Sequence, residues 1–88
     1  MAISSWQYTV TTNAQCVFGP DDDGAHVEVR VMGSNAVYFG GMGVTSENGF
    51  EIENDDGVVS LFIGPGECLY AICEEDTSKV CVLASLNE

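Results

Sequence analysis

The stretch that decides the fold is Val27-Glu28-Val29-Arg30-Val31, in which valine alternates with charged residues. Because successive side chains of a β-strand point to opposite faces, the alternation predicts a strand with one buried face and one solvated face. No window of the chain shows the i, i+3, i+4, i+7 apolar spacing of an amphipathic helix with caps. The sequence therefore predicts an all-β protein.

Further extended runs lie on both sides of this strand, separated by turns rich in Gly, Asn, Asp and Pro. They cover residues 6–12, 15–18, 36–39, 50–52, 58–63, 68–74 and 79–84. The run at 50–52 is weak, so we expect about seven strands at a spacing of roughly 8–12 residues. This is typical of a single small antiparallel β-sandwich or a jelly-roll-like barrel spanning residues 1–88. Residues 1–12 form either the first strand or an N-terminal arm.

Short loops predict two hairpins. Residues 33–35 would join the strand at 27–31 to the run at 36–39. Residues 76–78 would join the last two strands, with Glu75 opposite Lys79 and Cys73 opposite Cys81.

Acidic residues dominate the charge of the chain. There are 14 of them against two formal cations, Arg30 and Lys79, which gives a net charge of -12. Nucleic acid and anionic membrane surfaces are excluded as partners because both are bound through clustered Lys and Arg. The hydrophobic fraction of 45% distinguishes the chain from disordered acidic proteins. We expect a folded domain with an acidic surface.

The cysteines are expected to be free thiols. The first ten residues have neither the basic region nor the apolar region of a signal peptide, and no stretch is long enough for a membrane span, so we expect synthesis in a reducing cytoplasm. Cys16, Cys68, Cys73 and Cys81 do not have the paired spacing of a zinc ribbon. Cys68 and Cys73 are five residues apart and should point to opposite faces of a strand. A disulfide between Cys73 and Cys81 is the alternative under oxidising conditions.

Catalytic and metal-binding residues are scarce. The one histidine, His26, begins the alternating strand and has no nucleophile motif to serve, so we expect no enzyme and no cofactor. Acidic residues gather at 21–24, 55–57 and 74–76, where solvated turns are favoured over calcium loops because the EF-hand spacing fails. The glycine-rich residues 40–43 are expected to form a turn or bulge, since no helix follows them as in a phosphate-binding loop.

A resemblance to a known class of proteins rests on three segments in order. Residues 35–50 read NAVYFGGMGVTSENGF, and they are followed by LYAI at 69–72 and VCVL at 80–83. This combination, spread over about residues 27–84, resembles small β-sandwich virion proteins of tailed bacteriophages. These are capsid decoration (cement) proteins, head fibres or tail-associated modules.

The resemblance implies a virion structural protein, made in the host cytoplasm and placed on the outer surface of the phage head. There it would bind the major capsid protein as a homotrimer and stabilise contacts between capsomers. Repulsion by packaged DNA would direct the acidic surface outwards, so the least charged area of the domain should be the attachment surface. The aromatic and methionine candidates for that interface, each with the core as its alternative, are Trp6, Tyr8, Tyr38, Met42 and Phe50.

Two other functions were considered. A receptor- or carbohydrate-binding β-module of a fibre or tail would use an exposed aromatic platform, for which Trp6 and Tyr8 are the candidates. A cupin-like enzyme would need several His and carboxylate ligands, and the chain offers one histidine.

Overall fold

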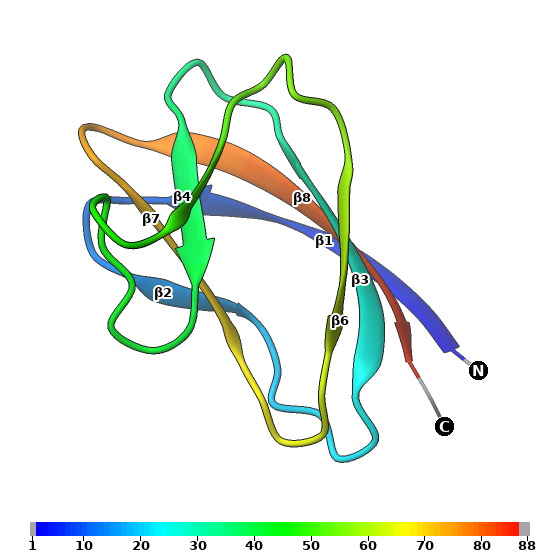
Figure 1. Ribbon diagram of the computed structural model, residues 1–88. Helices are drawn as coiled ribbons and strands as arrows, with labels where there is room; N and C mark the ends of the chain where they lie inside the picture. Colours follow the sequence, from blue (N-terminus) through cyan, green and yellow to red (C-terminus); the bar gives the residue numbers. More distant parts are fainter. Residues whose placement is uncertain (1, 87–88) are drawn as a thin grey trace.

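The computed structural model describes residues 2–86, with side chains over residues 3–85. This part of the chain contains eight β-strands and no helix (Figure 1). The strands are β1 (Ala2–Val10), β2 (Gln15–Phe18), β3 (Ala25–Val31), β4 (Val37–Gly40), β5 (Phe50–Ile52), β6 (Val59–Ile63), β7 (Leu69–Cys73) and β8 (Ser78–Leu86). The weak run at 50–52 is therefore a strand, and there are eight strands where about seven were expected.

The strands form two antiparallel four-stranded sheets. Sheet A has the order β1-β8-β3-β6, and sheet B has the order β2-β7-β4-β5. The pairs β1–β8, β2–β7, β3–β6 and β4–β5 are those of one long hairpin, which folds over so that β8 also pairs with β3 and β7 with β4. Two four-stranded sheets made in this way are a jelly roll. The predicted all-β sandwich or jelly roll is confirmed.

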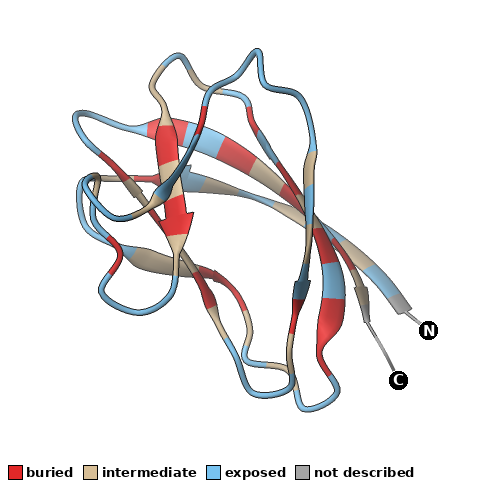
Figure 2. Cartoon of the chain, in the orientation of Figure 1, coloured by how far each residue is buried: buried red, intermediate tan, exposed pale blue. Residues whose placement is uncertain are grey.

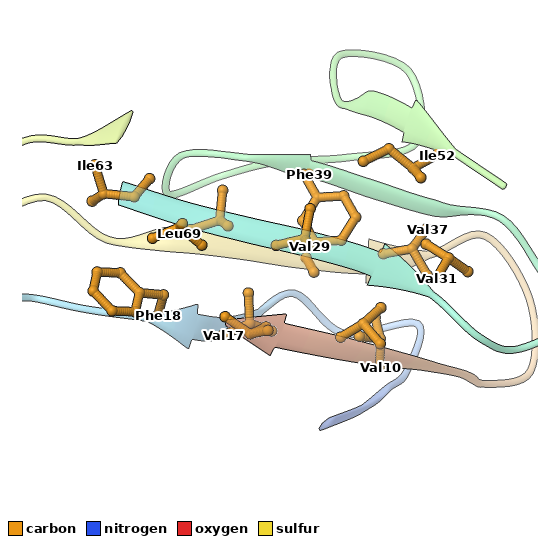
Figure 3. Close-up of a cluster of buried hydrophobic side chains, with 14 of the residues drawn as sticks. Val10, Val17, Phe18, Val29, Val31, Val37, Phe39, Ile52, Ile63 and Leu69 are labelled. Carbon is orange, nitrogen blue, oxygen red and sulfur yellow. The ribbon is translucent and has the colours of Figure 1, made fainter. Parts of the chain in front are cut away.

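Both predicted hairpins are wrong. The strands before and after residues 33–35 lie in opposite sheets, since β3 pairs with β6 and β8 while β4 pairs with β5 and β7. The reason is that both strands have an apolar face to bury. Val29 and Val31 on β3 and Val37 and Phe39 on β4 are buried between the two sheets, where a flat hairpin would have placed them side by side on one face (Figure 3).

The last two strands are also separated by a crossover. Cys73 on β7 pairs with Val37 in sheet B, whereas Cys81 on β8 lies between Gln7 and Arg30 in sheet A. The predicted facing of Cys73 with Cys81, and of Glu75 with Lys79, therefore does not occur. The chain changes sheets through residues 74–77, where Asp76 has a positive φ of 53°.

Apolar side chains from both sheets meet in one core (Figure 3). The buried positions alternate with exposed ones along the strands (Figure 2). The alternation on β3 continues as predicted, because Val27, Val29 and Val31 are buried while His26 and Arg30 are exposed. Trp6, Tyr8, Val59 and Leu61 pack against the buried cluster from the edges of the sandwich.

The first strand lies along the last one. Ala2–Val10 pairs with β8 over its whole length, from Ala2 opposite Leu86 to Val10 opposite Ser78. Of the two alternatives for residues 1–12, the described part of this segment thus forms a strand. Within residues 2–86 there is no helix of the length and apolar character needed to cross a membrane.

Candidate interaction surface

The outward-pointing side chains of sheet A form a surface that we call the A-face. It consists of every second residue of 3–9, 26–32, 58–62 and 79–85, whose neighbours in each strand point into the sandwich. The strand register aligns these positions in rows across the sheet. In one such row, Ile3, Ser85, His26 and Phe62 follow one another across all four strands.

Much of the exposed apolar surface gathers on the A-face. Among the described side chains seven large hydrophobic residues are exposed, and five of them belong to this face. They are Ile3, Met32, Val58, Phe62 and Leu83. Phe62 is 58% exposed on β6, the edge strand of sheet A. These side chains share one face of the sheet with polar residues between them, since Ser85 and His26 lie between Ile3 and Phe62 in the register.

The A-face also differs from the rest of the molecule in charge. Both cations of the chain, Arg30 and Lys79, are on it, whereas Glu28 is the one carboxylate among its described residues. The Ser60 hydroxyl donates to the Glu28 carboxylate at 3.2 Å. The other described acids lie in turns or on sheet B, so the A-face is the less acidic of the two sheet faces in a protein whose net charge is -12.

The outer side of sheet B, which we call the B-face, has the opposite character. It consists of the side chains of residues 16, 38, 51, 70 and 72, with Glu74 directly after β7. The Tyr38 hydroxyl donates to the Glu51 carboxylate at 3.2 Å. Partial burial, followed by the nearby carboxylates of Glu51 and Glu74, raises the pKa of Tyr38. The B-face is therefore acidic and rich in tyrosine.

An apolar cleft opens where the sandwich ends between β5 and β6. It has a volume of about 390 Å³ and is lined by side chains of both sheets, among them Phe39, Phe50, Ile52 and Leu61. Phe50 is opposite Phe39 in the strand register, yet it is 65% exposed because β5 is the edge strand of sheet B.

The opposite edge of the sandwich is closed by aromatic rings. The Trp6 indole N–H donates to the carbonyl oxygen of Val17 at 3.0 Å, and the ring stacks on Phe18 with centroids 6.0 Å apart. Tyr8 meets Trp6 edge-on at 6.4 Å. A shallow pocket of about 190 Å³ lies beside these rings and reaches Asp21.

The five residues predicted for the interface are spread over the molecule. Trp6 and Tyr8 are half-buried at the β1–β2 edge, Tyr38 is half-buried on the B-face, and Phe50 borders the cleft. Met42 is 85% exposed in the turn after β4, where Gly43 has the positive φ of 88° that favours glycine. The structure thus brings Trp6 and Tyr8 together and leaves the other three apart.

The sequence did not reveal the A-face as one surface, because its residues come from four distant segments. The distribution of charges along the sequence nevertheless indicated such a surface. Both cations lie in expected strands, whereas most acids lie in expected turns.

The cysteines have three different surroundings. Cys16 is opposite Tyr70, and Cys68 is two positions earlier on the same side, so the two thiols are neighbours. Burial chiefly, and then Cys68, raises the pKa of the Cys16 thiol. Cys73 is buried and donates to the carbonyl oxygen of Val10 at 3.5 Å. Cys81 is half-buried on the A-face, so the alternative of a disulfide between Cys73 and Cys81 is wrong.

The acidic turns use their carboxylates within the turns. Asp21 accepts from the backbone N–H of Asp23 at 3.0 Å, and Asp56 accepts from that of Glu53 at 2.7 Å. No group of three or more His, Cys, Asp or Glu residues in the described part of the chain is placed to hold a metal ion. The bond to Asp21 is that of an Asx turn, and the bond to Asp56 closes the turn at residues 53–56.

Comparisons with known proteins give one similarity of fold. No protein-family model matches the chain, and no curated protein matches it. A solved structure that matches is a chain of Bacillus endospore appendages, which form a family of disulfide-linked pili. The TM-score is 0.60 at 13% identity, and the match covers 94% of this chain and 82% of the pilus chain. The similarity establishes the shared all-β fold.

Proposed function

We propose that the protein is a non-enzymatic structural subunit of a particle built from many protein copies. The observation that carries the proposal is the A-face, which holds five of the seven exposed large hydrophobic side chains and a single carboxylate on an otherwise strongly acidic domain. Covering exposed apolar side chains with a partner is favourable because it removes their surface from water. The likeness of fold to a pilus subunit supports the same class of role, although a jelly roll by itself serves many functions.

In its specific form the particle is the head of a tailed bacteriophage. This rests on the resemblance of residues 27–84 to phage virion proteins. The protein would be made in the host cytoplasm and would sit on the outer surface of the capsid as a decoration protein, bound to the major capsid protein as a homotrimer. Its acidic turns would face solvent, and the A-face would be covered. Added buried area between capsomers would raise the barrier to rupture of the shell.

The other specific form is an extracellular filament, which the fold of the pilus chain supports. A decoration protein and a filament subunit differ in the protein that covers the A-face. A decoration protein covers its apolar surface with capsid, whereas a filament subunit covers it with further copies of itself.

The test is to mix the full chain with expanded capsids that lack decoration, and to image the chain alone by negative-stain electron microscopy both with and without reductant, because the pili of the matching structure are disulfide-linked. Saturable binding together with a higher capsid rupture temperature is expected of a decoration protein. Regular filaments of the protein alone are expected of a pilus-type subunit. A chain that neither binds capsids nor assembles at high micromolar concentration would overturn the proposal.

A second candidate is favoured by the pocket beside Trp6. A carbohydrate-binding module presents an aromatic ring next to polar groups, and this pocket combines Trp6 and Tyr8 with Asp21. The module would belong to a phage fibre or tail. A glycan array should then give hits that Tyr8→Ala removes. An array without hits would rule this candidate out.

A further inference from the structure

Several features of the molecule are candidates for binding a partner. The cleft between β5 and β6 is apolar but carries no sign of the chemistry of its occupant. The pair of Cys16 and Cys68 is partly buried and involves no other reactive group. The A-face and the B-face, by contrast, are two sides of one sandwich that differ in charge. This difference indicates which kind of surface each face can bind.

We propose that the A-face of one copy docks on the B-face of the next copy, so that the subunits stack through opposite sides of the sandwich. The inference rests on the filament form of the proposed function, in which further copies cover the A-face, and it names the side of the copy that does so. The second copy supplies Glu51 and Glu74 to face Arg30 and Lys79.

Charge selects this contact over the two alternatives. The A-face carries two cations against the single carboxylate of Glu28, and the B-face carries the acids Glu51 and Glu74 with neither cation of the chain. A contact of two A-faces would bring Arg30 and Lys79 towards another excess of positive charge. A contact of two B-faces would bring acids against acids. Like charges placed opposite each other at an interface oppose binding, so the contact between unlike faces is favoured.

The apolar side chains of the two faces also suit one another. The A-face offers Ile3, Phe62 and Leu83, all exposed. The B-face offers the half-buried rings of Tyr38 and Tyr70. Tyrosine is enriched at protein interfaces because its ring buries apolar area while its hydroxyl keeps a polar partner, as Tyr38 does with Glu51.

When the A-face of one copy binds the B-face of another, the resulting pair still has one free B-face and one free A-face. Each added copy presents a free A-face at one end and a free B-face at the other. Such a heterologous contact gives a ring if the rotation between copies closes and a filament if it does not. A pilus-type filament can be made in this way, whereas a contact between like faces would stop at a dimer.

The test measures self-association of the full chain by sedimentation velocity in reducing buffer. Reversal of the A-face charges by Arg30→Glu with Lys79→Glu, or of the B-face charges by Glu51→Lys with Glu74→Lys, should each weaken association by about tenfold or more. The four substitutions combined should restore it, since they exchange the two charge patterns and leave the net charge at the natural -12. Asp22→Lys with Asp23→Lys changes the net charge as much as the B-face pair does, in an exposed turn, and should not weaken association.

Each other outcome overturns the inference. Weakening by the A-face pair but not by the B-face pair would mean that two A-faces meet. Association that neither pair weakens would place the contact elsewhere. A natural chain that stays monomeric but binds capsids would remove the stacking and leave the proposed function standing. Circular dichroism melts of every variant separate loss of contact from loss of fold.

Discussion

The indole N–H of Trp6 donates to the carbonyl oxygen of Val17 across 3.0 Å, and so ties the edge strand of sheet A to the edge strand of sheet B. The same indole ring stacks on Phe18, the neighbour of Val17. One side chain thus closes the sandwich at the β1–β2 edge, while the β5–β6 edge has no such closure and holds the apolar cleft.

Trp6→Phe should keep most of the ring contact but remove the hydrogen bond. The free energy of unfolding is expected to fall by about 1–2 kcal/mol, because a partly buried carbonyl loses its donor. Urea unfolding followed by far-ultraviolet circular dichroism measures this without relying on the tryptophan signal. Ser5→Ala, exposed on the same strand, is the matched control and should stay within about 0.5 kcal/mol of the natural chain. A Trp6→Phe variant as stable as the natural chain would show that the bond contributes nothing.

Ser78→Ala should destabilise the crossovers at the other end of the sandwich. Ser78 is 4% exposed, and its hydroxyl donates to the carbonyl oxygen of Asn35 at 2.7 Å. The amide of Asn35 in turn donates to the carbonyl oxygen of Thr77 at 3.0 Å, so the loop before β4 and the loop before β8 hold each other. Loss of the Ser78 hydroxyl leaves a partly buried carbonyl without this donor, at an expected cost of about 1–3 kcal/mol.

The control for Ser78 is Ser60→Ala, which removes the exposed bond to Glu28. It should change the free energy of unfolding by no more than about 0.5 kcal/mol. Equal effects of the two substitutions would contradict the role given to the buried bond between the loops.

The strands could be predicted from the sequence, but their partners could not. Alternation in residues 27–31 identifies a strand and its buried face, because side chains alternate whatever the strand pairs with. The loop at 33–35 is short enough for a hairpin and long enough for a crossover between sheets about 10 Å apart. The local sequence pattern does not distinguish a hairpin from a crossover. The outcome depends on the pairing of β3 with β6 and β8, which lie far along the chain.

The same limit applies to the candidate surface. Arg30 and Lys79 are 49 positions apart in sequence, and they become members of one face because β8 lies beside β3. The expectation that the least charged area would be the attachment surface follows from the charge count of the sequence alone. Locating such an area on the molecule requires the order of the strands in the sheet.

Cys68→Ala should make Cys16 react faster with iodoacetamide at pH 8. The neighbouring Cys68 thiol contributes to raising the pKa of Cys16, so its removal should lower that pKa and increase the thiolate fraction, which is the reactive form. Peptide mapping by mass spectrometry gives the rate at Cys16 alone. Cys81→Ala, on the A-face, should leave this rate unchanged. An unchanged rate in Cys68→Ala would show that burial alone sets the pKa.

Cys73 should make the stability of the fold sensitive to alkaline pH. Burial raises the pKa of this thiol above its usual value of 9.0. The unfolded chain therefore loses the proton at lower pH than the folded chain, so the stabilising contribution of Cys73 is complete below pH 9.0 and is lost as pH rises through the higher folded pKa. Cys73→Ala should be less stable than the natural chain at pH 7, with a difference that shrinks towards pH 10. Urea unfolding at a series of pH values measures this. Cys81→Ala should keep the alkaline loss of the natural chain, and a Cys73→Ala difference that stays constant with pH would refute the assignment.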